Sequence, residues 1–252
     1  VAFGPSFAPH DFATQNLHSV NLPPSAAHWM GTDEFGRDVL SRTIYGARIS
    51  FTVGVLSIAA SMLAGALLGA LAAYYGGLLD RGISLLVDLT WSFPEVLTAL
   101  VLVAILGPGL SSVVIAVAVA YLAQFARLMR GQVRSLMNEA YVEASHALGA
   151  TDWRILARHI VPNAMGPLVA AGAVGIGGAI VLEATFSFLG LGAQPPVPSW
   201  GSMLSSGTGH LFIAPWPILF PGAVLMVVVL GFNLLGDAIL DLLETSRGNH
   251  AA

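Results

Sequence analysis

The chain of 252 residues is 56% hydrophobic and 10% charged, with a net charge of −4 and a mean hydropathy of +0.77. Water-soluble domains usually carry about 25% charged residues, so this composition excludes an ordinary soluble domain and predicts an integral membrane protein in contact with the lipid bilayer. The small net charge does not suggest a nucleic-acid partner, and the absence of cysteine excludes disulfides and thiolate metal sites.

All ten basic residues are arginines, and the chain contains no lysine. A phosphate-binding P-loop requires a lysine that reaches the β- and γ-phosphates of the nucleotide. The sequence therefore excludes such a loop, and we expect this chain to be no enzyme and to hold no cofactor. Any energy from ATP would have to come through a partner.

Residues 1–48 are expected to form an external loop followed by a helix at the membrane surface. Residues 1–30 are rich in proline, serine, asparagine and histidine, which is typical of an extended loop. The start at Val1, in a short apolar stretch, favours a hydrophobic helix upstream. In residues 31–50, Thr32 is placed to cap an amphipathic helix whose first turn holds two acidic residues.

Five segments are apolar over the roughly 20 residues that a spanning helix needs. They are residues 49–75, 83–107, 110–126, 165–193 and 216–236. They make residues 49–236 the transmembrane domain of an all-α protein, and residues 237–252 a cytoplasmic tail. An upstream helix would give the full protein six spans with both ends in the cytoplasm. The first segment has many small residues, which permit close helix packing in lipid.

The arginines are divided unequally between the two sides that these spans define. One side carries Arg37, Arg42 and Arg48. The other side carries Arg81, Arg127, Arg130, Arg134, Arg154, Arg158 and Arg247. Because cytoplasmic loops carry the excess of basic residues, the second side is predicted to face the cytoplasm.

The cytoplasmic loop at residues 127–164 is predicted to contain two short helices. Gly149 can end the first helix in a left-handed conformation, Thr151 can cap the second, and Pro162 closes the unit. Their apolar stripes consist of Tyr141, Ala144, Ser145 and Leu148, then Trp153, Leu156, Ala157 and Ile160. Such helices either dock in a groove on a partner protein or fold back onto the chain's own helix ends. Periodicity alone leaves both interpretations open.

Within this loop, residues 139–162 read EAYVEASHALGATDWRILARHIVP and resemble the EAA loop of binding-protein-dependent ABC importers. The family pattern is matched at Glu143, Ala144, Gly149 and Pro162. The sequence departs from that pattern at Ser145, His159 and Val161, where the family has alanine, isoleucine and leucine.

Four further stretches resemble the dipeptide, oligopeptide and nickel permease branch. They are GTDEFGRDVLSR (31–42), AAYYGGLLDR (72–81), FSFLGLGAQPPVPSWGSML (186–204) and FNLLGD (232–237). The long external loop before the first of them is more similar to the second permease subunit of such systems than to the first. The resemblance extends over nearly the whole chain from about residue 22 onward.

This resemblance implies a type I ABC importer permease fold with a cytoplasmic coupling helix, in the inner membrane of a prokaryote. It implies a second homologous permease subunit, two ATP-binding subunits that carry ATP and Mg²⁺, and an extracytoplasmic substrate-binding protein. Glu143, Ala144 and Gly149 would belong to the coupling element that docks on the ATPase. The substrate would be short peptides, nickel or a related small solute.

Three acidic residues within the predicted spans are candidates for the translocation path, because an ionisable side chain in the membrane is costly. Glu183 lies in the middle of the fourth segment. The alternative role for its side chain is a polar lock, meaning a protonated or hydrogen-bonded contact with a neighbouring helix. Asp88 and Glu95 lie in the second segment beside Pro94, which is expected to bend the helix. Asp88 could equally sit at the cytoplasmic interface.

The histidines show no spacing typical of a metal site, and we predict none. Four of them, His10, His18, His28 and His210, are predicted to be external, so that a loose cluster is conceivable. The external segment QPPVPSWGSML (194–204) carries Trp200, a side chain suited to the membrane–water boundary. That segment is expected either to receive the substrate-binding protein or to act as a rigid connector.

Two other functions remain to be weighed. The first is an ion-gradient-driven secondary transporter that uses Glu183 and Asp88 as coupling groups, although no internal repeat is evident. The second is an intramembrane protease. Ser199 and Ser202 would be its nucleophiles, but no histidine lies at a suitable position in a span.

Overall fold

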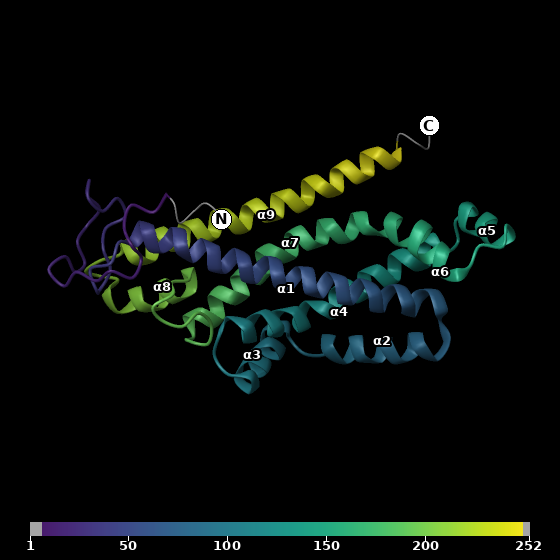
Figure 1. Ribbon diagram of the computed structural model, residues 1–252, viewed down its shortest axis with the longest axis horizontal. Coiled ribbons are helices and arrows are strands. Elements are labelled where there is room, and N and C mark those ends of the chain that lie inside the picture. The colour runs from purple at the N-terminus through teal and green to yellow at the C-terminus, as the bar shows by residue number, and fades with distance from the viewer. Residues whose placement is uncertain (1–6, 249–252) are drawn as a thin grey trace. The chain divides into compact units, whose positions relative to one another are not determined.

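The computed structural model describes the backbone of residues 7–248 and the side chains of residues 7–243, and Figure 1 traces its helices. The start of the chain at Val1 and the Arg247 side chain lie outside these ranges. In the described part every regular element is a helix, apart from one isolated β-bridge. The helices are α1 (Val39–Tyr75), α2 (Gly77–Trp91), α3 (Glu95–Leu106), α4 (Leu110–Leu136), α5 (Ala140–Ala147), α6 (Asp152–Ile155), the π-helix η2 (Leu156–Ile160), α7 (Val161–Phe188), α8 (Trp200–Gly207), the 3₁₀-helix η3 (Thr208–His210) and α9 (Trp216–Gly248).

Four helices of the described chain are long and apolar enough to cross a membrane, which confirms the all-α membrane fold. They are α1, α4, the continuous helix Asp152–Phe188 and α9. The second predicted segment is bent near Pro94, as the sequence predicted, and the bend is a full break: α2 and α3 meet at an angle of 91° across the residues that include Pro94. The pair counts as a fifth span if it is taken as one broken helix.

The chain divides into two compact units, and each long helix contributes a segment to both. Unit 1 comprises Val1–Leu56, Leu100–Val117 and Ile176–Gly231. Unit 2 comprises Ser57–Ala99, Ala118–Gly175 and Phe232–Ala252. The segments predicted to be external belong to unit 1, and the loop predicted to couple to an ATPase belongs to unit 2.

In unit 1 the first helix begins six residues later than the sequence indicated, so the prediction that Thr32 caps it is wrong. Asp38 occupies that position, and its Oδ2 accepts a hydrogen bond of 2.8 Å from the backbone N–H of Ser41. Asp33 instead accepts bonds from the backbone N–H groups of Phe35 and Arg37. These local bonds compete with a helix and hold the segment as a turn.

The predicted surface helix and the predicted first span form a single helix, because α1 continues without interruption from Val39 to Tyr75. The last helix is also longer than predicted. It continues through Gly248, so that residues 237–248 of the predicted cytoplasmic tail are helical.

In unit 2 the small residues of α1 permit the close packing that the sequence predicted. A Cβ atom on Gly69 would overlap the backbone carbonyl of Ala126 in α4, so only glycine allows this approach. The core that forms beside it is built from α1, α4, α5, α6, η2 and α7. Its buried members are Ala70, Ala73, Met129, Val133, Val142, Ile155, Leu156, Ile160, Ala164 and Leu168.

Candidate functional site

The turn between α5 and α6 has the backbone geometry that the sequence predicted. Gly149 has a φ of +77°, in the left-handed region that glycine adopts without strain. Its N–H bonds the carbonyl of His146, and the N–H of Ala150 bonds the carbonyl of Ser145. This pair of bonds is a Schellman motif, which ends α5 and satisfies two of its last carbonyl groups.

The second helix begins where it was predicted but does not end there. Thr151 stands at the N-cap position with extended backbone angles, although its side chain makes no capping bond. The prediction that Pro162 closes the unit is wrong, because α6, η2 and α7 run on as one helix through that residue. The π-helical stretch directly before Pro162 widens the turn, which is one way a helix accommodates a residue that lacks an N–H group.

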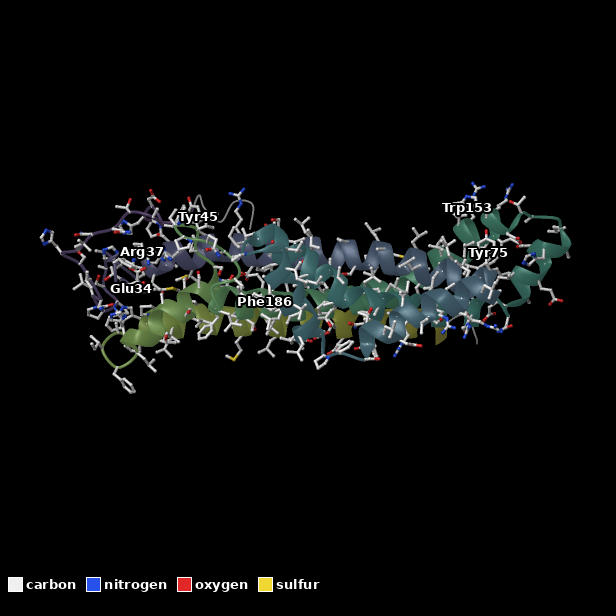
Figure 2. The ribbon with its side chains drawn as sticks, turned by 90° about the horizontal axis from the view of Figure 1, so that it is seen from below. Glu34, Arg37, Tyr45, Tyr75, Trp153 and Phe186 are labelled. Carbon is white, nitrogen blue, oxygen red and sulfur yellow. The ribbon has the colours of Figure 1, made fainter. Side chains whose placement is uncertain are left out.

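The predicted apolar stripes are split between the chain's own core and its surface. Leu156 and Ile160 are buried in the unit 2 core, and Val142 of α5 joins them there. Trp153 is 63% exposed and Leu148 at the tip of the turn is 88% exposed. Trp153 projects from α6 in Figure 2. The hairpin therefore folds back onto unit 2 with one face and presents the other outward.

The remaining residues expected to form the coupling element lie on or near this outward face. Glu143, Ala144 and Gly149 are exposed, and Ser145 is half-buried with its hydroxyl donating to the Tyr141 carbonyl. Ala157 is exposed and lines a groove, together with Trp153 and the 62–71 segment of α1. The groove has a volume of about 280 Å³ and an almost wholly apolar lining.

Three of the predicted cytoplasmic arginines are ion-paired within unit 2. Arg130 binds both oxygens of Asp80 at 2.6 and 2.9 Å, and Arg134 adds a bond of 2.7 Å to the same carboxylate. Arg127 binds Asp88 at 2.7 Å and stacks over Trp91. These contacts hold α2 against α4. Sequence reasoning missed the role of Asp80, because no spacing relates a residue to partners 50 and 54 positions away.

Glu183 is fully buried in unit 1. The Ser50 hydroxyl of α1 donates to its Oε2 at 2.6 Å, and the Ser187 hydroxyl donates to its Oε1 at 2.7 Å. Ser187 in turn accepts a bond from the backbone N–H of Ala193. Glu183 thus joins α1, α7 and the segment that follows α7. This geometry favours the polar lock over a group that faces a path.

Asp88 and Glu95 belong to unit 2, whereas Glu183 belongs to unit 1. The Asp88 carboxylate is 66% exposed and is engaged by Arg127. Glu95 stands at the first turn of α3 and lines a cavity of about 180 Å³ with polar neighbours that include Thr98 and Gln124. Of the three acids, Glu95 alone lines this cavity.

Trp200 lies in the interior of unit 1, so its side chain is covered by protein and does not face lipid or water. Its side chain is fully buried, and its indole N–H donates to the Thr43 carbonyl at 3.0 Å. Its ring packs edge-on against Phe51. Ser199 and Ser202 form the capping box of α8, which accounts for both hydroxyls that a protease would have used.

Known proteins are similar in sequence to this chain over most of its length. The family model described as the binding-protein-dependent transport system inner membrane component matches residues 65–248. The dipeptide transport system permease protein DppC of Alkalihalophilus pseudofirmus is 43% identical, over 96% of this chain and 80% of its own. The glutathione transport system permease protein GsiD of Pectobacterium atrosepticum is 44% identical, over 89% and 75%. The oligopeptide transport system permease protein OppC of Bacillus subtilis is 40% identical, over 96% and 79%.

Solved structures share the fold at lower identity. A chain of the inward-facing MetNI methionine ABC transporter has a TM-score of 0.63 and is 19% identical, over 78% of this chain and 94% of that one. A chain from the crystal structure of an amino acid ABC transporter with histidines has a TM-score of 0.60 and is 18% identical, over 78% and 92%. These likenesses confirm the type I ABC importer permease fold. The chain belongs to the binding-protein-dependent transport system inner membrane component family, as a permease of the peptide branch of ABC importers in the inner membrane.

Proposed function

We propose that this chain forms half of the translocation pathway of an ATP-driven importer of short peptides, and that residues 139–162 couple it to a separate ATPase. The observation that carries the coupling role is the exposure of Leu148 and Trp153 on an ordered hairpin. Large apolar side chains on an exposed, arginine-rich hairpin do not gain the free energy of burial unless a protein covers them. A groove on an ATP-binding subunit is a suitable cover.

Contacts within unit 2 that anchor the hairpin support this coupling role. Val142, Leu156 and Ile160 anchor it in the unit 2 core, and the Tyr74 hydroxyl donates to Asp152 at the start of α6. From Asp152 the helix continues without a break to Phe188. A displacement at the docked face would therefore pass to the start of α7 within unit 2 instead of being absorbed by a flexible loop.

The partners follow from the same role. A second permease subunit would complete the path, two ATP-binding subunits would carry ATP and Mg²⁺, and a substrate-binding protein would deliver the solute from outside. The named relatives transport dipeptides, oligopeptides and glutathione. The solute they have in common is a short peptide with charged termini, and we propose the same class here.

Photo-crosslinking from single cysteines tests the docking face cleanly, because the chain has no native cysteine. Leu148→Cys carrying benzophenone maleimide should crosslink to the ATP-binding subunit in the assembled complex. Phe212→Cys is the matched control, since its side chain is 99% exposed but lies in unit 1, in a segment predicted to be external. A control that crosslinks as strongly as Leu148→Cys would overturn the assignment.

Reconstituted vesicles separate this proposal from a secondary transporter. In vesicles whose lumen contains the ATP-binding subunits, uptake should require ATP in the lumen. It should persist without an ion gradient. Uptake that needs a proton gradient and proceeds without ATP would contradict it.

A further inference from the structure

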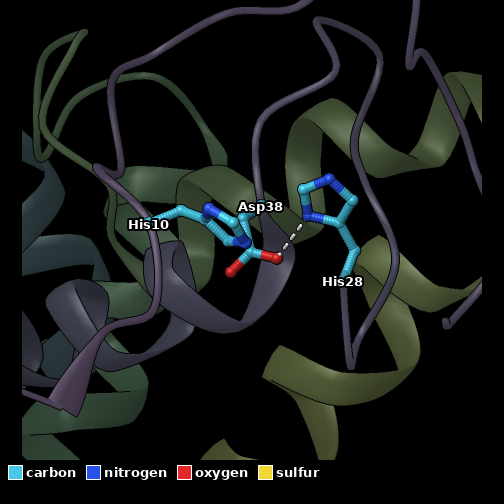
Figure 3. A group of neighbouring side chains, drawn as sticks. All are labelled: His10, His28 and Asp38. Atoms are coloured by element: carbon cyan, nitrogen blue, oxygen red, sulfur yellow. Dashed lines mark hydrogen bonds and ion pairs between the residues drawn. The ribbon is translucent and has the colours of Figure 1, made fainter. Parts of the chain in front are cut away.

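The external loop and the start of α1 bring two histidines and an aspartate together in unit 1. Ligand atoms of His10, His28 and Asp38 all lie within 4.8 Å of one another (Figure 3). The two imidazole rings have centroids 4.8 Å apart and are tilted by 38°. The three residues are separated by 18 and 10 positions in sequence, so the folding of the loop creates the cluster.

The carboxylate of Asp38 is held in place before any ligand arrives. Its side chain is only 1% exposed, and its Oδ2 accepts bonds of 2.8 and 2.7 Å from the backbone N–H and hydroxyl of Ser41. Its Oδ1 faces Nδ1 of His28 at 2.9 Å. Both oxygens are therefore oriented, one toward the helix and one toward the histidines.

The His10 ring is also oriented by a backbone group. Its Nε2 lies 2.9 Å from the Ala27 carbonyl, which can only accept a hydrogen bond, so Nε2 carries the proton. Nδ1 is then the nitrogen with a free lone pair. Histidines that bind metals commonly donate their other ring N–H to a carbonyl in this manner, which fixes the tautomer and the ring.

Two imidazole nitrogens and one carboxylate oxygen suit a borderline divalent cation such as Zn²⁺, with a fourth position left for water. Neighbouring ligand atoms around tetrahedral Zn²⁺ lie about 3.3 Å apart, given metal–ligand bonds of about 2.0–2.1 Å. The pair formed by His28 and Asp38 is already within this spacing. The ligand atom of His10 lies within 4.8 Å of the other two, and a small movement of the exposed loop that carries His10 would close the remaining gap.

We propose that His10, His28 and Asp38 form a site for a divalent transition-metal ion of the Zn²⁺ type, which fastens the external loop to the first residue before α1. The ion would join three points of the chain that hydrogen bonds alone now connect. This proposal is independent of the transport cycle, and its test measures binding to the chain itself.

The experiment is a Zn²⁺ titration of the full chain in nanodiscs, purified without a polyhistidine tag and treated with a chelator, against a zinc-responsive dye. We expect one saturable site per chain. His10→Ala and His28→Ala should each weaken its affinity at least about tenfold, and Mg²⁺ should not compete because it prefers oxygen ligands. His18→Ala is the matched control, an exposed histidine of the same loop outside the cluster, and should bind like the wild type.

X-ray absorption at the zinc edge then identifies the ligands. We expect nitrogen and oxygen neighbours at about 2.0–2.1 Å, and a reduced nitrogen contribution in His28→Ala. Neither histidine variant removes the Asp38 cap, so α1 should remain intact in both. Absence of a saturable site, or equal affinity in the wild type and both histidine variants, would overturn the proposal and leave the cluster as a hydrogen-bonded helix cap.

Discussion

Gly149 lies at the turn between α5 and α6 with a positive φ, and nothing stands within 4 Å of the place where a Cβ would be. Any effect of a substitution there is therefore conformational and not a clash. The left-handed conformation costs other residues roughly 1–2 kcal/mol, and β-branched residues are least suited to it.

Replacing Gly149 with valine should weaken the affinity between the chain and the ATP-binding subunit by about tenfold. A conformational cost of about 1.4 kcal/mol corresponds to that factor in a dissociation constant. The measurement is peptide uptake together with ATP hydrolysis in the reconstituted complex, and we expect uptake to fall more than hydrolysis. Gly131→Val is the matched control, because that glycine is helical and also has open space around it. Normal uptake by Gly149→Val would show that the turn does not need this backbone shape.

Glu183 should contribute to stability more than to substrate recognition. Glu183→Leu leaves the buried Ser50 and Ser187 hydroxyls without their carboxylate partner, at a cost of about 1–3 kcal/mol for each group left unsatisfied. Glu183→Gln keeps a side chain that can bond both hydroxyls, so it should unfold near the wild-type temperature and retain uptake. Thermal unfolding and uptake should be measured for both. Loss of uptake in a stable Glu183→Gln variant would assign the carboxylate to the path instead.

At the scale of elements, the ion pairs of Asp80 hold α2 against α4 within unit 2. The Asp80 side chain is 14% exposed and binds two arginines. In the Asp88–Arg127 pair, both side chains are exposed. Hydrogen bonds to charged groups contribute about 1.5–3 kcal/mol, while exposed pairs contribute about 1 kcal/mol or less.

Asp80→Asn should therefore lower the free energy of unfolding of the chain in detergent by about 1–3 kcal/mol. Asp88→Asn, the same chemical change on the same helix, should lower it by less than about 1 kcal/mol. Equal losses in the two variants would mean that burial does not distinguish the pairs.

The elements differ in how far their sequence determines them. Apolar length predicted the spanning helices, and Gly149 predicted the turn, because both depend on residues close in sequence. The start of α1 was mispredicted at Thr32, because the bonds of Asp33 to Phe35 and Arg37 favour a turn over a helix start. The burial of Trp200 depends on Thr43, which is 157 positions away. No local pattern contains that information.

At the scale of the whole molecule, the unequal distribution of arginines predicts which loops face the cytoplasm. The chain's lack of cysteine again allows a direct test with a membrane-impermeant maleimide. Phe212→Cys should react in intact cells or spheroplasts, whereas Leu148→Cys should react only in inside-out vesicles from which the ATP-binding subunits have been removed. The reverse pattern would invert the predicted topology and remove the ATPase from the proposed docking face.

The break between α2 and α3 has a consequence for hydration. Because the pair forms one candidate span, its non-helical residues would lie at membrane depth, where such backbone is tolerated only if protein covers it or water reaches it. Phe93 and Pro94 are exposed in this chain, and the adjoining cavity is lined by Glu95, Thr98 and Gln124. A hydrated kink of this kind would let a peptide keep part of its hydration shell within the bilayer. Its charged termini would then not have to be fully dehydrated.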